Sequence, residues 1–212
     1  RRGHDHSRSG RGRRAVRASC FIDATGDGDV IARLGLPFTL NDGPQPPTVC
    51  CYLLGLDEVI RRNPGFDLAK AVHDPRFPNA LKQGTLWWSR LPGANQIAMV
   101  AGTRAHGADC SDADQLTGAE IECRRQARAI RDIVRHNFAG GEAVPLAAVS
   151  SYIGIRESRH ATCLHRLTEQ EVLEGVRFPD AVANGSYRVD VHHSNRAGIT
   201  FRYLDGTEIY SA

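Results

Sequence analysis

The sequence predicts a mixed α/β fold in which a mainly antiparallel sheet packs with one long helix. Apolar, β-prone runs such as TVCCYLLGL (48–56) and NQIAMVAGTR (95–104) are separated by turn residues. One segment, 117–138, has the three- and four-residue apolar spacing of an amphipathic helix. Hydrophobic residues make up 41% of the 212 positions, which is enough for a packed core.

The first 47 residues contain a basic lead, one expected strand and a proline-rich loop. Residues 1–17 are predicted to be a flexible lead. In RAVRASCFIDAT (14–25), the run CFI favours a buried strand that ends at a glycine-rich turn. The segment PFTLNDGPQPP (37–47) is expected to be irregular, because proline lacks the amide hydrogen that regular elements need.

The middle of the chain predicts two strands and the long helix. GTLWWSRL (84–91) and NQIAMVAGTR flank the turn PGAN, and alternation should turn one of Trp87 and Trp88 inward. Thr117 and Glu120 fit a capping box at the start of the helix, and Gly140 and Gly141 follow its end. Its expected apolar face consists of Cys123, Ala127, Ile130, Val134 and Phe138.

The C-terminal third predicts a short helix and further strands. A second capping box, Thr168 with Glu171, begins the helix. In SYRVDVHH (186–193), alternation would turn Tyr187, Val189 and Val191 inward. Asp205-Gly206 lies between two strand-like runs and predicts a type I′ hairpin turn.

Charge and composition exclude several classes of function. Seven of the 27 basic residues lie in the first 17 positions beside one acid, so the remaining chain carries 20 basic and 23 acidic residues. A nucleic-acid binder is therefore not expected, and the basic lead is more simply a solvated end. No apolar run of about 18 residues predicts a membrane helix. Six cysteines without a CxxC pair or a signal-peptide pattern favour free thiols and a cytoplasmic location.

The stretch FIDATGDGDV (21–30) suits one of two chemistries, a cation loop or a nucleotide turn. Asp23, Asp27 and Asp29 nearly match the start of an EF-hand loop, but its position twelve, normally glutamate, is Leu34. His160, Cys163 and His165 also fit no standard zinc spacing. No metal site is therefore predicted.

A nucleotide turn needs glycines where the backbone approaches the cofactor most closely. Gly26 and Gly28 supply them, and carboxylates beyond the strand accept hydrogen bonds from sugar hydroxyls. The predicted cofactor-binding residues of this turn are Thr25, Gly26, Asp27, Gly28 and Asp29. A plain glycine- and aspartate-rich turn remains the alternative.

Four stretches resemble a bacterial family of FAD-dependent oxidoreductases. They are FIDATGDGDVIARLGLPF (21–38), TRAHGADCSDADQLTGAEIECRRQ (103–126), IGIRESRH (153–160) and LTEQEVLEGVRFPDAVANGSYRVDVHH (167–193). The resemblance implies FAD as the cofactor and flavin-mediated hydride transfer involving a small organic substrate. The family's GxGxxG motif does not occur, so the resemblance is to an internal fragment. A truncated remnant or a binding module without cofactor is the alternative.

The resemblance also implies a domain division and further site residues. Residues 18–46 would belong to the FAD-binding domain and 47–212 to the substrate domain, with 151–160 returning toward the flavin. Within GIRESRH, Arg156 is the catalytic candidate and Arg159 a cofactor-binding candidate, with strand alternation placing Arg156 and Ser158 on one face. A structural arginine–carboxylate pair is the alternative for these arginines. His192 is a second catalytic candidate, for proton transfer, and a structural histidine is its alternative.

Overall fold

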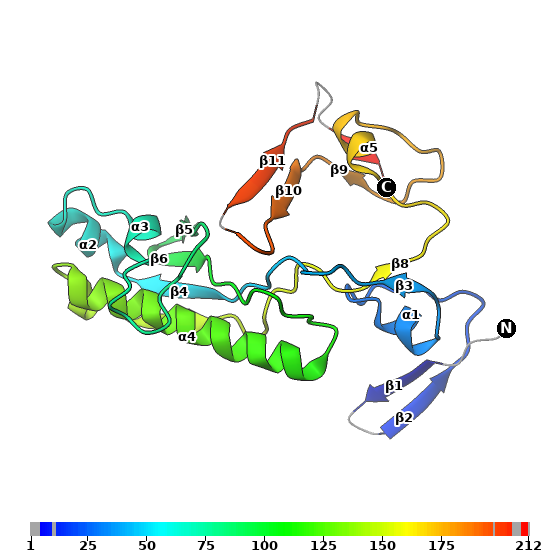
Figure 1. Cartoon of the computed structure of the whole chain (residues 1–212), viewed down its shortest axis with the longest axis horizontal. Coiled ribbons are helices and arrows are strands. Elements are labelled where there is room, and N and C mark those ends of the chain that lie inside the picture. Colours follow the sequence, from blue (N-terminus) through cyan, green and yellow to red (C-terminus); the bar gives the residue numbers. More distant parts are fainter. Residues whose placement is uncertain (1–4, 10–11, 197, 205–208, 212) are drawn as a thin grey trace.

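The computed structural model describes residues 5–9, 12–196, 198–204 and 209–211, and its largest element is a four-stranded antiparallel sheet (Figure 1). The strands lie in the order β5-β6-β4-β7. Their bounds are β4 Cys50–Leu54, β5 Trp87–Leu91, β6 Ala94–Ala101 and β7 Leu146–Val149. The predicted strands and the turn at Pro92-Gly93 are confirmed, because Leu91 pairs with Ala94 across it. Trp88 packs on the core, whereas Trp87 is exposed.

The long helix α4, Ala113–Asn137, runs along one face of this sheet (Figure 1). Ala127, Ile130 and Val134 pack against buried residues of β4 and β6, and Cys123 packs in a second cluster with Val49 and Ile153. The predicted apolar face is therefore confirmed. Burial of this face provides most of the helix's stability, because isolated helices are marginal in water.

The predicted start of α4 is wrong. Asp112 is the N-cap and accepts a hydrogen bond from the Gln115 amide. The Thr117 hydroxyl instead donates to the Ala113 carbonyl one turn back, inside the helix. The helix ends at Asn137, and Gly140 follows it with a φ of 81° before a short 3-10 turn, η1 Gly141–Ala143.

Two short helices follow β4 in the chain and cover one end of the sheet. They are α2 Leu56–Arg62 and α3 Leu68–Ala71. Leu56, Val59 and Leu68 join the same core cluster as α4. Asp67 caps α3 by accepting from the amides of Ala69 and Lys70.

The N-terminal region lies beyond the other end of the sheet (Figure 1). Strands β1 Asp5–Ser9 and β2 Gly12–Val16 pair antiparallel, which the sequence did not predict. The strand predicted around CFI is absent from residues 17–28, where Phe21 and Ile22 are exposed. This apolar run has no neighbouring strand to pair with in the described chain. Helix α1, Asp29–Arg33, follows the glycine-rich turn.

The described residues of the C-terminal part form one helix and four short strands. They are α5 Glu169–Leu173, β9 Asn184–Gly185, β10 Val189–His192, β11 Ile199–Arg202 and β12 Tyr210–Ser211. The capping box of Thr168 and Glu171 is confirmed at α5. In β10 the inward side chain is His192, whereas Tyr187 and Val191 are exposed, so the predicted alternation is wrong. The His192 amide donates to the Gln45 side chain.

The predicted turn at Asp205-Gly206 lies outside the described residues. Its flanking strands do not pair with each other, because β11 pairs with β10 and β12 pairs with β9. Across the described part of the chain, no helix is both long and apolar enough to cross a membrane. In those same residues all six cysteines are free thiols, and burial raises the pKa of the Cys51 thiol to about 12.

Candidate functional site

The glycine-rich turn is held by its own aspartate and threonine side chains. The Asp23 carboxylate accepts from the Thr25 hydroxyl at 2.7 Å, from the Thr25 amide and from the Ile31 amide of α1. These hydrogen bonds, with the Thr25 hydroxyl first, lower the pKa of Asp23. Thr25 in turn accepts from the Asp29 amide. Asp23 therefore connects the turn to α1.

The other two aspartates bind Ser158 and Arg159 of the GIRESRH motif. Asp27 accepts a 2.7 Å hydrogen bond from the Ser158 hydroxyl, and Asp29 pairs with Arg159 at 2.8 Å. All three carboxylates thus have protein donors. No cluster of metal-ligating side chains occurs among the residues that the structure describes.

Arg159 is the main link between the turn and the rest of the site. Besides Asp29, it donates to the carbonyls of Asp27 and Ser111, and its guanidinium lies 5.7 Å from the Phe38 ring centre. The adjoining strand β8, His160–Ala161, pairs with β3, Phe38–Thr39. The structural ion pair considered for the arginines of this motif is therefore found at Arg159.

Residues 155–159 form an extended segment without strand pairing. The predicted two-face alternation is wrong, because Ser158 and Arg159 both contact the turn. Glu157 contacts a different loop, accepting from the Gln45 amide and the Asn41 side chain. It also accepts from His160 at 2.9 Å. Because no strand pairing sets the direction of these side chains, each one turns toward its own polar partner.

Arg156 differs from Arg159 in having no carboxylate at ion-pair distance among the described residues. Among the described residues its hydrogen-bond partner is the Thr48 hydroxyl, which lies 3.3 Å from Nη2. Loss of hydration lowers the pKa of Arg156, and the charge of Asp190 partly opposes this effect. An arginine remains charged under such conditions, so its charge is available to a ligand.

A cavity of about 530 Å³ brings these segments together. Its wall includes Gly26, Arg156, Arg159 and His192. Four of the predicted site residues therefore face one space, although they come from three separate stretches of sequence. Thr25, Asp27, Gly28 and Asp29 do not line the cavity and instead hold its wall in place.

His192 is a buried titratable residue of this cavity's wall, with 8% of its surface exposed. Its Nδ1 is buried without a hydrogen-bond partner, and its Nε2 lies 3.4 Å from Asp190. Burial first, and then the charges of Arg156 and Arg104, lower the pKa of His192. The imidazole is therefore neutral near pH 7 and can take up a proton at Nδ1.

Sequence reasoning missed Gln45, which lines this cavity, and Arg104, which lies outside its wall but acts on His192 through its charge. Gln45 lies in the proline-rich loop, donates its amide to Glu157 and accepts from the His192 amide. Buried Arg104 contributes positive charge, and its pKa is lowered by burial and by Arg156. A polar side chain inside a proline-rich loop is a usable signal for Gln45, since that loop needs partners outside itself. No local pattern marks Arg104.

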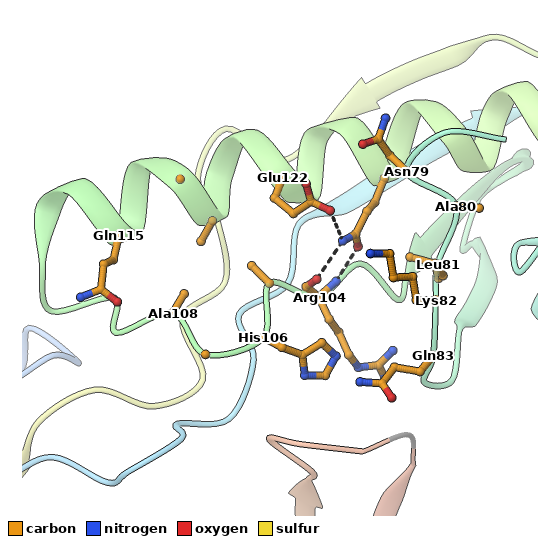
Figure 2. A pocket seen from close by; sticks show the side chains of 15 residues that line it. Asn79, Ala80, Leu81, Lys82, Gln83, Arg104, His106, Ala108, Gln115 and Glu122 are labelled. Carbon is orange, nitrogen blue, oxygen red and sulfur yellow. Dashed lines mark hydrogen bonds between the residues drawn. The ribbon is translucent and has the colours of Figure 1, made fainter. Parts of the chain in front are cut away.

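A second cavity, of about 700 Å³, lies between α4 and the loop before β5 (Figure 2). Arg104 and His106 border it, together with Glu122 of α4. The Arg104 guanidinium donates to the carbonyls of Thr85 and Gly102 and to the Thr85 hydroxyl. None of the predicted site residues lines this cavity, so the first cavity is the candidate site.

Comparison with known proteins gives one result. A family model described as "FAD dependent oxidoreductase" matches residues 5–211. No curated protein and no solved structure matches the chain. Because the family match extends over almost the whole sequence, the chain belongs to the FAD-dependent oxidoreductase family, with FAD as the cofactor.

Proposed function

We propose that the chain transfers a hydride between a small organic substrate and FAD, at the cavity lined by Gly26, Arg156 and His192. The observation that carries this proposal is the convergence of these three residues on one space. In this proposal, residues 18–46 belong to the FAD-binding domain and residues 47–212 to the substrate domain. The segment 151–160 returns to contact the flavin side.

The residues present fit a cofactor at the turn. A Cβ on Gly26 would have no protein atom within 4 Å, so this cavity-lining position is open to an approaching group. Gly28 differs, since a Cβ there would lie 3.5 Å from Arg159. The open space at Gly26 therefore allows a ligand to approach closely. Gly28 instead allows Arg159 to pack against the turn.

In the proposed reaction the cofactor and the cavity residues have separate roles. Bound FAD supplies the two-electron acceptor of a hydride. Arg156 holds a positive charge beside the cavity and stabilises negative charge that develops there. His192 accepts the proton that a substrate hydroxyl or amine loses when the adjacent carbon is oxidised. Arg159 and Asp29 keep the turn in place.

Two glycine variants test the cofactor position. Gly26→Ala would place a methyl group in the cavity, and we expect the dissociation constant for FAD to rise about tenfold, measured by flavin fluorescence. Gly35→Ala is the matched control, because Gly35 also has a positive φ, 66°, and open space around it but does not line the cavity. Both variants should lose similar stability. Equal FAD affinities in the two variants would contradict the proposed position.

A further inference from the structure

The charged side chains of the cavity wall differ in how many hydrogen-bond partners they have within the protein. The Glu157 carboxylate accepts from Asn41, Gln45 and His160, and only 8% of its side chain is exposed. Arg166 donates to the other ring nitrogen of His160 at 3.0 Å, which extends this network to a cation. The negative charge of Glu157 is therefore already matched by protein donors.

The positive charge of Arg159 is also matched. Its ion pair with Asp29 and its two backbone carbonyl partners occupy the guanidinium, and 15% of the side chain is exposed. Among the described residues, Arg159 uses three of the five N–H groups that a guanidinium carries, whereas Arg156 uses one, in its Nη2 bond to Thr48, so Arg156 has more unused donors.

The surroundings of Arg156 carry an excess of positive charge. Burial, and then the charge of Arg156, lower the pKa of Arg104, whose own hydrogen-bond partners are neutral oxygens. Asp190 is the carboxylate that acts on Arg156. Neither guanidinium has a carboxylate at ion-pair distance among the described residues, so a ligand carboxylate can pair with Arg156.

A second observation indicates a ligand beside this charge. His192 is more than nine-tenths buried and lines the cavity, yet its Nδ1 has no partner among the described residues. A buried polar atom without a partner is costly, so a ligand atom or water is expected against it. The cavity therefore offers an unmatched cation and an unmatched imidazole nitrogen together.

We propose that the substrate is a small carboxylic acid whose carboxylate pairs with Arg156, while the rest of the molecule contacts His192. A guanidinium binds a carboxylate through two parallel N–H groups, which fixes its orientation as well as its position. This inference rests on the proposed function for the identity of the ligand as substrate. The carboxylate site itself is formed by the chain without the cofactor.

The test is a titration of the 212-residue protein, without FAD, with sodium lactate and sodium acetate. Sodium chloride at matched ionic strength is the control for general salt effects. We expect a saturable rise in melting temperature with the carboxylates and at least a tenfold weaker affinity in Arg156→Gln. Arg156→Lys keeps the charge but loses the paired donors, so its affinity for the carboxylates should lie between that of the wild type and that of Arg156→Gln.

Arg61→Gln is the matched control variant, because Arg61 is an exposed arginine on α2 that pairs with Glu58. It should bind the carboxylates as the wild type does. Equal affinity in the wild type and Arg156→Gln, or no saturable binding, would overturn the proposal. Inorganic phosphate is titrated in parallel, and tighter binding of phosphate than of lactate would overturn the carboxylate assignment.

The FAD titration of the same samples keeps the two proposals separate. Carboxylate binding that depends on Arg156 in a protein that does not bind FAD would support the carboxylate site and contradict the proposed flavin function. FAD binding without carboxylate binding would leave the flavin function standing and overturn the substrate assignment.

Discussion

Arg104 and Arg156 illustrate how neighbouring residues of one type take different tasks. Arg104 is buried, and carbonyl and hydroxyl oxygens surround its guanidinium. Arg156 is largely without protein partners and faces the cavity. The first arginine connects the loop before β5 to the end of β6, and the second is available to a ligand. We therefore expect substitutions around Arg104 to affect stability and substitutions of Arg156 to affect binding.

Gly84 provides the first prediction at this scale. Its φ is 103°, and a Cβ there would lie 2.3 Å from Nη1 of Arg104. Gly84→Ala should lower the free energy of unfolding by about 2 to 3 kcal/mol, through backbone strain and displacement of Arg104. Chemical denaturation measures this loss. Gly93→Ala, with a φ of 77° and no atom near the Cβ position, should show the strain alone, about 1 kcal/mol.

The difference in stability loss between Gly84→Ala and Gly93→Ala tests whether Arg104 causes the larger loss. In an Arg104→Met background, the difference between Gly84→Ala and Gly93→Ala should shrink, because the guanidinium no longer occupies the space. If Gly84→Ala and Gly93→Ala cost the same in the wild type, Arg104 can move without loss, and its hydrogen bonds do not stabilise the loop.

His192 gives a pH prediction. Its pKa is lowered from the ordinary 6.5 by burial and by the charges of Arg156, Arg104 and His193, while Asp190 opposes the shift. Below pH 6.5 the unfolded chain binds the proton first, so acidification favours unfolding. The free energy of unfolding should therefore fall as pH drops below 6.5, by at most about 1.4 kcal/mol per pH unit from this one group.

Denaturant unfolding of His192→Gln at several pH values tests whether His192 causes this pH dependence of stability. The variant should have a shallower dependence on pH below 6.5 than the wild type. His136→Gln, a substitution of an exposed histidine on α4, should leave the dependence unchanged. A steeper decline in His192→Gln would mean that His192 takes up its proton more readily in the folded chain.

At the scale of elements, the sequence predicted what local patterns determine. The apolar spacing of α4, the strands β4 to β6 and the capping box of α5 depend on nearby residues and are confirmed. The start of α4 was misplaced because two caps compete, and Asp112 has a partner, Gln115, that the Thr117 pattern concealed. The extended segment 155–159 depends on Asp27, Asn41 and Gln45, which are more than 100 positions away.

The two competing caps of α4 make a direct test. Asp112→Ala removes the acceptor for the Gln115 amide and should lower the free energy of unfolding by about 1 kcal/mol. Thr117→Ala should change it by less than about 0.5 kcal/mol, because its hydroxyl bonds to a carbonyl within the helix. Thermal or urea denaturation compares the two. A larger loss in Thr117→Ala would restore the helix start predicted from the sequence.

At the scale of the whole molecule, one segment that carries exposed apolar surface is residues 21–40. Six exposed large apolar side chains fall within residues 21–40, namely Phe21, Ile22, Leu34, Leu36, Phe38 and Leu40. The sequence predicted burial of the first two because an apolar run normally indicates a core strand. Whether a run is covered depends on which other elements lie beside it, and a local pattern does not contain that information.

This distribution predicts how the protein behaves as it is concentrated. Exposed apolar patches promote association, so the wild type should self-associate at high concentration in sedimentation velocity. Ile22→Ser combined with Leu36→Ser should reduce that association, since both side chains are exposed, Ile22 by 87%. The pair should change the free energy of unfolding by less than about 1 kcal/mol, because neither side chain is buried in the core.

Two controls separate surface effects from effects on the core. Val182→Ser removes another exposed apolar side chain, outside residues 21–40, and should leave the association unchanged. Leu53→Ala, at a fully buried position in β4, should cost about 2 to 5 kcal/mol. If the Ile22 and Leu36 pair destabilised the fold to a similar extent, these residues would belong to the core in solution. The segment 21–40 would then be covered in a way that the described structure does not show.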